Sequence, residues 1–194
     1  MGKYDAIEKG LFEAAEPFFK KFGGKASRAA GDAAEKAPFK TTKLKESYRG
    51  ENQPGGIIGP WGDRIEVRYL DDVERRDYKL TVDEDGLLRD SKGRPFNSLA
   101  GENPDAPGAI FVMDEHGNIY ASNFEEYGKF HHSSLLGGED VAGAGTLSVS
   151  DGRVNAISNS SGHYRPSAEL NQQVVDHLRS QGVRIDDDMI DFTW

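Results

Sequence analysis

The sequence predicts an α+β fold with N-terminal helices, a mainly antiparallel sheet of five to seven strands and a C-terminal helix. Three observations predict it. An apolar stripe at helical spacing runs through residues 4–22, strand–turn–strand units follow between residues 81 and 157, and a capped amphipathic pattern begins at Ser167. The sheet is expected to carry the helix at the C-terminal end on one face.

The first predicted element is a helix over residues 4–22. Ile7, Leu11 and Phe22 belong to one apolar stripe, because they lie on one side of a helix with a period of 3.6 residues. Pro17 is expected to kink this helix. Residues 24–46 are rich in Ala and Lys and predict a second helix or a linker.

A boundary is predicted near residue 49. Residues 1–49 carry a net charge of +4, and the remainder carries −13. We therefore predict a helical N-terminal appendage or linker over 1–49, which supplies no catalytic group, and an α+β effector domain over 50–194. Residues 53–62 are rich in Gly and Pro and predict a loop, with a lid as one interpretation.

Short strands joined by turn residues predict the sheet. Residues 65–70 alternate as a half-buried strand does. Three hairpins are predicted at the turns 90–93, 114–117 and 151–152, where an Asp is followed by a Gly. In the last helix Ser167 is the expected N-cap, and Gly182 is expected to end it.

Composition excludes several classes of site. The sequence has no cysteine, so disulfides, Cys-ligated zinc and a Cys nucleophile are absent. No stretch approaches 18 apolar residues, so no membrane span or signal peptide is expected. The net charge of −9 makes nucleic acid an unexpected partner, because an acidic surface repels phosphates.

The residues suited to chemistry gather in two blocks, 130–138 and 160–167. The blocks flank the third predicted hairpin, so we expect them to form one cleft. His131 and His132 would point to opposite faces at a strand end, so only one of the two is expected to face that cleft.

The residue types in this cleft suit a polar ligand such as a nucleotide. Serine hydroxyls can bind phosphate oxygens, an aromatic ring can stack on a base, and Arg is a planar cation. Imidazole and carboxylate groups can exchange protons. The candidate catalytic residues are His132, His163 and Glu169, and the candidate cofactor-binding residues are Ser133, Ser134, Ser161, Tyr164 and Arg165.

Structural interpretations of the same residues stay open. Each His can be a buried, hydrogen-bonded structural residue, and Ser161-Gly162 can be a simple turn. Arg165 can merely lead into the last helix, where Glu169 would interact with the helix dipole. Adjacent histidines seldom share one metal ion, so no metal site is expected.

Residues 109–182 resemble a C-terminal domain of bacterial polymorphic toxins of the Rhs or secreted type. The resemblance rests on the His-Ser-Ser motif at 132–134, the Ala-Gly-Ala-Gly run at 142–145 and the Ser-Gly-His-Tyr motif at 161–164. A similar pair of motifs is found in plant IQ-motif calmodulin-binding proteins of the IQM type. No basic IQ helix is present in this sequence, so calmodulin binding is not implied.

The toxin resemblance implies an effector enzyme that acts on a cytosolic target. Zinc deaminases need Cys ligands, and the acidic body disfavours a nuclease. The expectation is therefore a transferase that uses NAD, as an ADP-ribosyltransferase or an NAD-cleaving enzyme, or another nucleotide such as ATP for AMP transfer. This context implies secretion or delivery into a target cell at the end of a larger polypeptide, with a possible cognate immunity protein as a partner. The alternative from another class is a non-catalytic protein-binding module.

Overall fold

The computed structural model describes residues 39–98 and 108–193. Contacts divide the chain into two units, Met1–Lys36 and Ala37–Trp194, and the first of these lies wholly outside the described residues. The helix expected over residues 4–22 and most of the segment 24–46 therefore lie outside them too. The division of the chain after residue 49 stays a prediction.

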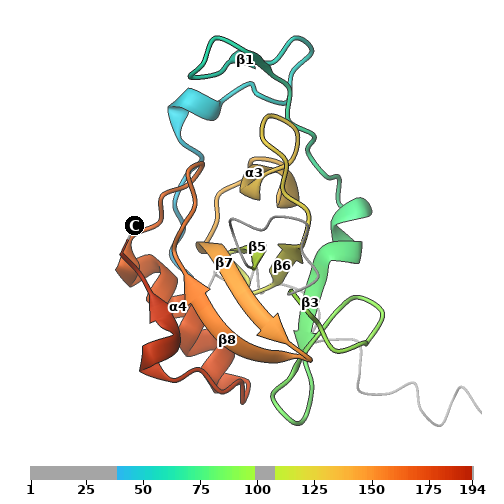
Figure 1. Ribbon diagram of the computed structural model, residues 1–194, viewed down its shortest axis with the longest axis vertical. Coiled ribbons are helices and arrows are strands. Elements are labelled where there is room, and N and C mark those ends of the chain that lie inside the picture. The colour runs from blue at the N-terminus through green and yellow to red at the C-terminus, as the bar shows by residue number, and fades with distance from the viewer. Residues whose placement is uncertain (1–38, 99–107, 194) are drawn as a thin grey trace, which may run out of the picture. The chain divides into compact units, whose positions relative to one another are not determined.

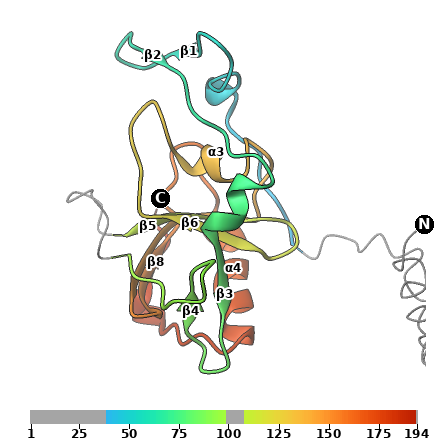
Figure 2. The same cartoon turned by 90° about the vertical axis from the view of Figure 1, so that its right-hand side faces the viewer.

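The second unit is built on a sheet with short helices, as the α+β prediction requires (Figures 1 and 2). Its elements are η1 (Glu46–Tyr48), β1 (Ile57–Ile58), β2 (Arg64–Ile65), η2 (Glu74–Tyr78), β3 (Lys79–Val82), β4 (Leu88–Arg89), β5 (Ala109–Met113), β6 (Ile119–Ser122), α3 (His132–Leu135), β7 (Gly143–Ser150), β8 (Arg153–Ser158), α4 (Ala168–Ser180), η3 (Asp187–Met189) and β9 (Ile190–Asp191).

The main sheet has seven strands in the order β4-β3-β6-β5-β7-β8-β9. Every neighbouring pair is antiparallel except β8 and β9, which are parallel. The first predicted hairpin is displaced, because β3 and β4 pair around a turn at residues 83–87 and the expected turn at 90–93 follows β4. The other two are confirmed as β5–β6 and β7–β8. In the last of them Asp151 and Gly152 have φ values of 48° and 82°, the left-handed conformation that an Asp-Gly turn adopts.

Strand β5 shows why the sheet carries apolar groups on both faces. All five of its residues are buried, and successive side chains point to opposite faces. Phe111 and Met113 pack in a cluster with Val174 and Leu178 of α4. Ile110 and Val112 pack in a second cluster with Leu135 of α3. The helix α4 thus covers one face of the sheet, and α3 lies over the other.

The small residues at 142–145 serve backbone packing within the fold. A Cβ atom at Gly143 would lie 2.2 Å from a methyl group of Val174, and one at Gly145 would lie 1.9 Å from the carbonyl oxygen of Ser158. Glycine is required at both positions because α4 and the end of β8 approach β7 this closely. The run was expected to permit close backbone approach, and the approaching groups belong to the chain itself.

The C-terminal helix forms as predicted. The Ser167 hydroxyl accepts a hydrogen bond from the amide of Leu170 at 3.2 Å, and the helix ends at Ser180, two residues before Gly182. Among residues 39–98 and 108–193, no helix has the length and apolar character that crossing a bilayer needs.

Two extended segments, residues 65–70 and the segment around Lys45, lie at the end of the unit beyond α3. Of the strand expected over residues 65–70, only its first residue pairs as a strand, in β2. The amides beyond it donate to separate acceptors, with Val67 bound to the Glu51 carbonyl at 2.8 Å and Leu70 to the Ser134 carbonyl at 2.9 Å. The amide of Lys45 donates to the His163 carbonyl at 2.9 Å. The bonds of Leu70 and Lys45 attach these two segments to the two motif blocks.

Candidate functional site

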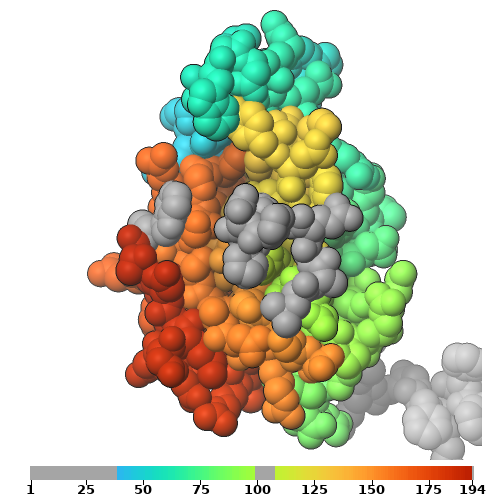
Figure 3. All heavy atoms as spheres, in the orientation of Figure 1, coloured from blue at the N-terminus to red at the C-terminus, as the bar shows by residue number. Residues whose placement is uncertain are grey.

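A cavity of about 320 Å³ lies where the two motif blocks meet the Gly-rich loop. Figures 1 and 2 both show the segment of β1 and β2 beyond α3, at the end of the unit, and in Figure 3 the same teal residues lie against the yellow segment that carries α3. We call this space the histidine cavity. It is lined by Tyr48, Glu51, Pro60, Trp61, Ile65, Glu125, Tyr127, His131, His132, Thr146, Ser160, Gly162 and His163.

Glu51 is the centre of the hydrogen-bond network at the floor of the cavity. Its side chain is completely buried, and its carboxylate accepts hydrogen bonds from the Ser133 hydroxyl at 2.6 Å and the Tyr69 hydroxyl at 3.1 Å. The Nε2 atom of His163 lies 3.1 Å from the other carboxylate oxygen. Burial by itself would raise the pKa of Glu51, but the His163 interaction and the two hydroxyl donors lower it below the ordinary value. Glu51 is therefore ionised, and His163 donates to it from Nε2.

The imidazole of His163 is held between two other rings. The ring of Tyr48 stacks on it with a centroid distance of 4.0 Å and an interplanar angle of 26°. The ring of His131 lies at a centroid distance of 4.5 Å from it, with an interplanar angle of 30°. Stacking and the bond to Glu51 fix the orientation of His163 at the cavity wall.

The backbone fixes the tautomer of His131. Its Nε2 atom lies 2.9 Å from the amide nitrogen of Gly128, which can only donate, so Nε2 carries the lone pair. The Nδ1 atom lies 3.5 Å from the Glu125 carboxylate. Burial by itself would raise the pKa of Glu125, but the hydrogen bond from His131 and the neighbouring histidines lower it below its ordinary value. The ionised Glu125 carboxylate therefore faces the Nδ1 atom of His131.

His132 is the most deeply buried of the three histidines. Its Nε2 atom donates to the Gly145 carbonyl at 2.9 Å, because a carbonyl can only accept. Burial lowers the pKa of His132 to about 4, so the ring is neutral at neutral pH. Residues 132–135 form the single helical turn of α3 rather than a strand end, and both His131 and His132 consequently line the cavity.

The buried state of His132 predicts a pH dependence of stability. Between pH 6.5, its ordinary pKa, and about 4, the unfolded chain protonates this residue while the folded protein does not. Proton binding by the unfolded state favours unfolding, so the free energy of unfolding should decrease as the pH falls through this window, by about 2 kcal/mol at pH 5. Urea unfolding at pH 7.5, 6.5, 5.5 and 5 measures it. The lowered pKa values of Glu51 and Glu125 act in the same direction, but only below their ordinary value of 4.5.

His132→Gln should flatten this dependence, since Gln keeps a donor for the Gly145 carbonyl and does not titrate. The matched control is His116→Gln, because His116 is exposed in the turn after β5. It should leave the slope as in the wild type. An unchanged slope in His132→Gln would show that another group dominates the titration.

The mouth of the histidine cavity is aromatic and exposed. Trp61 is 77% exposed and Tyr127 is 47% exposed. Their rings meet edge to face with a centroid distance of 4.9 Å. Both line the cavity, and we call them the aromatic rim. The loop 53–62 thus supplies Trp61 to the mouth of the cavity.

The structure brings the two predicted blocks together at one cavity, but it distributes their residues differently. Of the candidate site residues, His132 and His163 line the histidine cavity. Ser133 and Ser134 are fully buried. The Ser133 hydroxyl binds Glu51, and the Ser134 hydroxyl accepts from the His131 amide at 2.9 Å.

The remaining candidates lie outside the cavity lining. Tyr164 is fully buried, and its hydroxyl donates to the Glu139 carbonyl at 2.9 Å. Ser161 is buried without a hydrogen-bond partner for its hydroxyl among the described residues. Arg165 is exposed with a φ of 45° in the turn before α4, and Glu169 is exposed in the first turn of that helix. The places of Arg165 and Glu169 fit the structural interpretation given for them above.

Sequence reasoning missed Glu51, Glu125, Tyr48 and the aromatic rim. A single Glu in a polar loop has no pattern that distinguishes it from a solvated one, and Glu51 lies 112 positions from His163. Trp61 had a weak signal, because a large aromatic residue stands there among Gly and Pro. In the described part of the chain, no group of three His, Asp or Glu residues is arranged to hold a metal ion.

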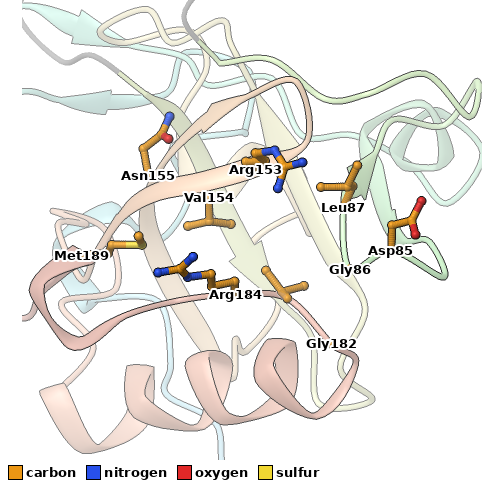
Figure 4. Close-up of a pocket in the computed structure, with 10 residues that line it drawn as sticks. Asp85, Gly86, Leu87, Arg153, Val154, Asn155, Gly182, Arg184 and Met189 are labelled. Carbon is orange, nitrogen blue, oxygen red and sulfur yellow. The ribbon is translucent and has the colours of Figure 1, made fainter.

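A second cavity of about 300 Å³ lies on the other side of the unit, between β8 and the segment that follows α4 (Figure 4). Its basic residues are Arg153 of β8 and Arg184. Arg184 pairs with Asp186 at 2.7 Å. None of the candidate residues lies here, whereas the histidine cavity is lined by both motif blocks and by the two carboxylates Glu51 and Glu125, whose pKa values are lowered although burial opposes this. The histidine cavity is therefore the candidate functional site.

Comparison with known proteins identifies similarity over the same region. The pattern of the family described as IQ motif-containing protein middle domain matches residues 74–171. The chain is 33% identical over 120 residues to "IQ domain-containing protein IQM3" of Arabidopsis thaliana, covering 62% of this chain and 26% of that protein. It is 34% identical over 117 residues to "IQ domain-containing protein IQM1" of the same plant, covering 60% and 23%. No solved structure matches.

The chain thus spans about a quarter of the length of these relatives. The matched range 74–171 includes the three histidines and Glu125, but not Glu51 or Trp61. The wall formed by the motif blocks therefore lies within the region of similarity, whereas the Gly-rich loop lies outside it.

These comparisons correct the expected function. The similarity to IQM-type proteins is confirmed, but the matches are plant IQ domain proteins and contain no bacterial toxin. The prediction of a polymorphic-toxin transferase for interbacterial competition is therefore wrong. The two motifs on which that prediction rested also have structural roles, because the hydroxyl groups of Ser133, Ser134 and Tyr164 form hydrogen bonds inside the fold. NAD as a ligand and delivery into a target cell stay predictions.

Proposed function

Because the chain belongs to the family of the IQ motif-containing protein middle domain, we propose that it is a non-catalytic protein-binding module that docks a partner protein at the aromatic rim. The Arabidopsis thaliana relatives IQM3 and IQM1 are much longer chains, of which the matching segment is one part. A module that brings a partner to a larger protein suits such an arrangement.

The observation that carries this proposal is the exposure of Trp61 beside a cavity with a polar floor. A tryptophan that is 77% exposed presents a large apolar surface to water, and its contact with Tyr127 joins two such surfaces. Tryptophan and tyrosine are the residues that most often dominate protein–protein binding energy, particularly next to a pocket that a partner side chain can fill.

The floor of the cavity supports binding rather than turnover. His163 donates to Glu51 as the histidine of a catalytic triad donates to its carboxylate. Among the described residues, however, no serine or threonine hydroxyl is hydrogen-bonded to His163, and the Thr146 hydroxyl is bonded to Ser158 at 2.7 Å. Among those residues the His163–Glu51 pair is not hydrogen-bonded to a serine or threonine nucleophile, and it rigidifies the wall that a partner would contact.

Site-directed crosslinking tests this function. Benzoylphenylalanine is placed at position 61 or, as a control, at position 73, where the native Val73 is 68% exposed but does not line the cavity. A partner that docks at the rim should crosslink from position 61 and not from position 73. The crosslinked protein is then identified and purified for binding measurements with the full chain.

Trp61→Ala should weaken binding of that partner by about 30-fold, which corresponds to about 2 kcal/mol for a residue that dominates an interface. Val73→Ala should change the Kd by less than about twofold. Calorimetric titration measures both. Equal affinities for the wild type and Trp61→Ala, or crosslinks of equal strength from both positions, would overturn the proposal.

A further inference from the structure

We propose that the histidine cavity receives a basic side chain of the docked partner, the ammonium group of a lysine or the guanidinium group of an arginine. This inference rests on the protein-binding function proposed above and names the chemistry that the site selects. It follows from the charge of the cavity, the accessibility of one carboxylate and the aromatic walls.

Among the described residues, those that line the cavity include two carboxylates and no lysine or arginine. The carboxylates are Glu51 and Glu125. Three basic residues close in sequence to the lining residues have other partners, since Lys129 pairs with Glu126, Arg49 pairs with Glu46, and Arg64 binds the Gly55 carbonyl. A ligand in this space therefore meets fixed negative charge without a compensating cation from those groups.

The histidines do not cancel this charge. The Nε2 atom of His131 accepts from the Gly128 amide, and burial lowers the pKa of His132 to about 4. The imidazole of His163 is hydrogen-bonded to Glu51 rather than to Glu125, so Glu125 keeps its charge facing the cavity. An anionic ligand would be repelled, and an apolar side chain would desolvate a carboxylate without replacing its hydrogen bonds.

Glu125 is the carboxylate that a ligand can reach. Its side chain is 31% exposed, and its one close polar contact among the described residues is His131 Nδ1 at 3.5 Å. The Glu51 side chain is 0% exposed and already has three donors. Glu125 is thus free to accept hydrogen bonds from a cationic donor, whereas Glu51 acts through its charge.

The walls suit a cation as well as the floor does. Trp61, Tyr127 and Tyr48 all line the cavity, and the negative face of an aromatic ring attracts an ammonium or guanidinium group. The volume of about 320 Å³ is at the lower end of ligand pockets, which fits a single long side chain rather than a folded segment. The partner backbone would then lie on the aromatic rim while its basic side chain enters the cavity.

Blocked tripeptides test the inference directly. The probes are acetyl-Gly-Lys-Gly-amide, acetyl-Gly-Arg-Gly-amide and the norleucine analogue, which has the length of lysine without its charge. Binding is followed by Trp61 fluorescence in the full chain carrying Trp194→Phe, because the sequence has two tryptophans. The lysine and arginine peptides should bind at least tenfold more tightly than the norleucine peptide. Added salt should weaken the binding of the two basic peptides.

Glu125→Gln and Glu126→Gln provide a matched pair, since the same charge is removed from adjacent residues and only Glu125 lines the cavity. Glu125→Gln should weaken binding of the basic peptides about tenfold, and Glu126→Gln less than twofold. Thermal melting confirms that both variants are folded.

The outcomes separate this inference from the proposed function. If the norleucine peptide binds as tightly as the basic ones, or if both Gln variants behave alike, the cation inference is overturned. The proposed function then still stands or falls with the effect of Trp61→Ala on the crosslinked partner. Tetramethylammonium is the last probe. If it binds more tightly than either basic peptide, the cavity is a site for a free small cation rather than for a partner side chain.

Discussion

Glu51→Ala is expected to lower the free energy of unfolding by about 3–5 kcal/mol, because three donors converge on this buried carboxylate. The substitution leaves the Ser133 hydroxyl, which is fully buried, without its acceptor at 2.6 Å. It also removes the charge to which His163 donates. Chemical denaturation at pH 7.5 measures the change.

Two variants make the Glu51 result interpretable. Glu51→Gln keeps the volume but offers one acceptor oxygen in place of two, so its loss should be smaller than that of Glu51→Ala. Glu46→Ala is the control, since Glu46 lies in the same segment and its side chain is 79% exposed. It should unfold as the wild type does. A Glu51→Ala protein as stable as Glu46→Ala would show that the network does not hold the Gly-rich loop to the motif blocks.

Tyr164→Ala is expected to have a comparable effect, a loss of about 3–5 kcal/mol in the free energy of unfolding, because removal of a fully buried aromatic ring leaves a cavity in the core. The ring belongs to the apolar cluster that packs α3 against the sheet. Tyr164→Phe removes only the hydroxyl bond to the Glu139 carbonyl and should cost about 1 kcal/mol.

The matched comparison for Tyr164 is Tyr127→Ala. Tyr127 is 47% exposed at the aromatic rim, so its replacement should leave the unfolding transition nearly unchanged and weaken partner binding. Tyr164→Phe should instead lower stability by the small amount given above and leave partner binding unchanged. If Tyr164→Phe bound the partner or the basic peptides more weakly without a loss of stability, Tyr164 would be a ligand-contacting residue, as its place in the Ser-Gly-His-Tyr motif first indicated.

The sequence correctly predicted that the two motif blocks meet, but it predicted ligand-binding roles for residues that have structural ones. His132 and His163 do meet in one cavity, because the β7–β8 hairpin returns the chain to its starting edge. The side-chain types of Ser133, Ser134 and Tyr164 suit a nucleotide site. In the folded protein, however, each of their hydroxyl groups is hydrogen-bonded to another part of the chain. A polar side chain in a motif can bind a ligand or satisfy a buried neighbour, and residue type alone does not distinguish these roles.

By itself the sequence determined the features that depend on neighbouring residues. The Asp-to-Gly turns after β5 and β7 and the cap and apolar stripe of α4 each act within a few positions, so these two hairpins and the C-terminal helix could be predicted. Only the tertiary structure decided which polar groups meet. Glu51 lies 82 positions from Ser133 and 112 from His163, and Trp61 reaches the same cavity from a loop without a strong pattern. Such contacts arise where packing buries a charge, and a buried charge must find donors wherever the folded chain brings them.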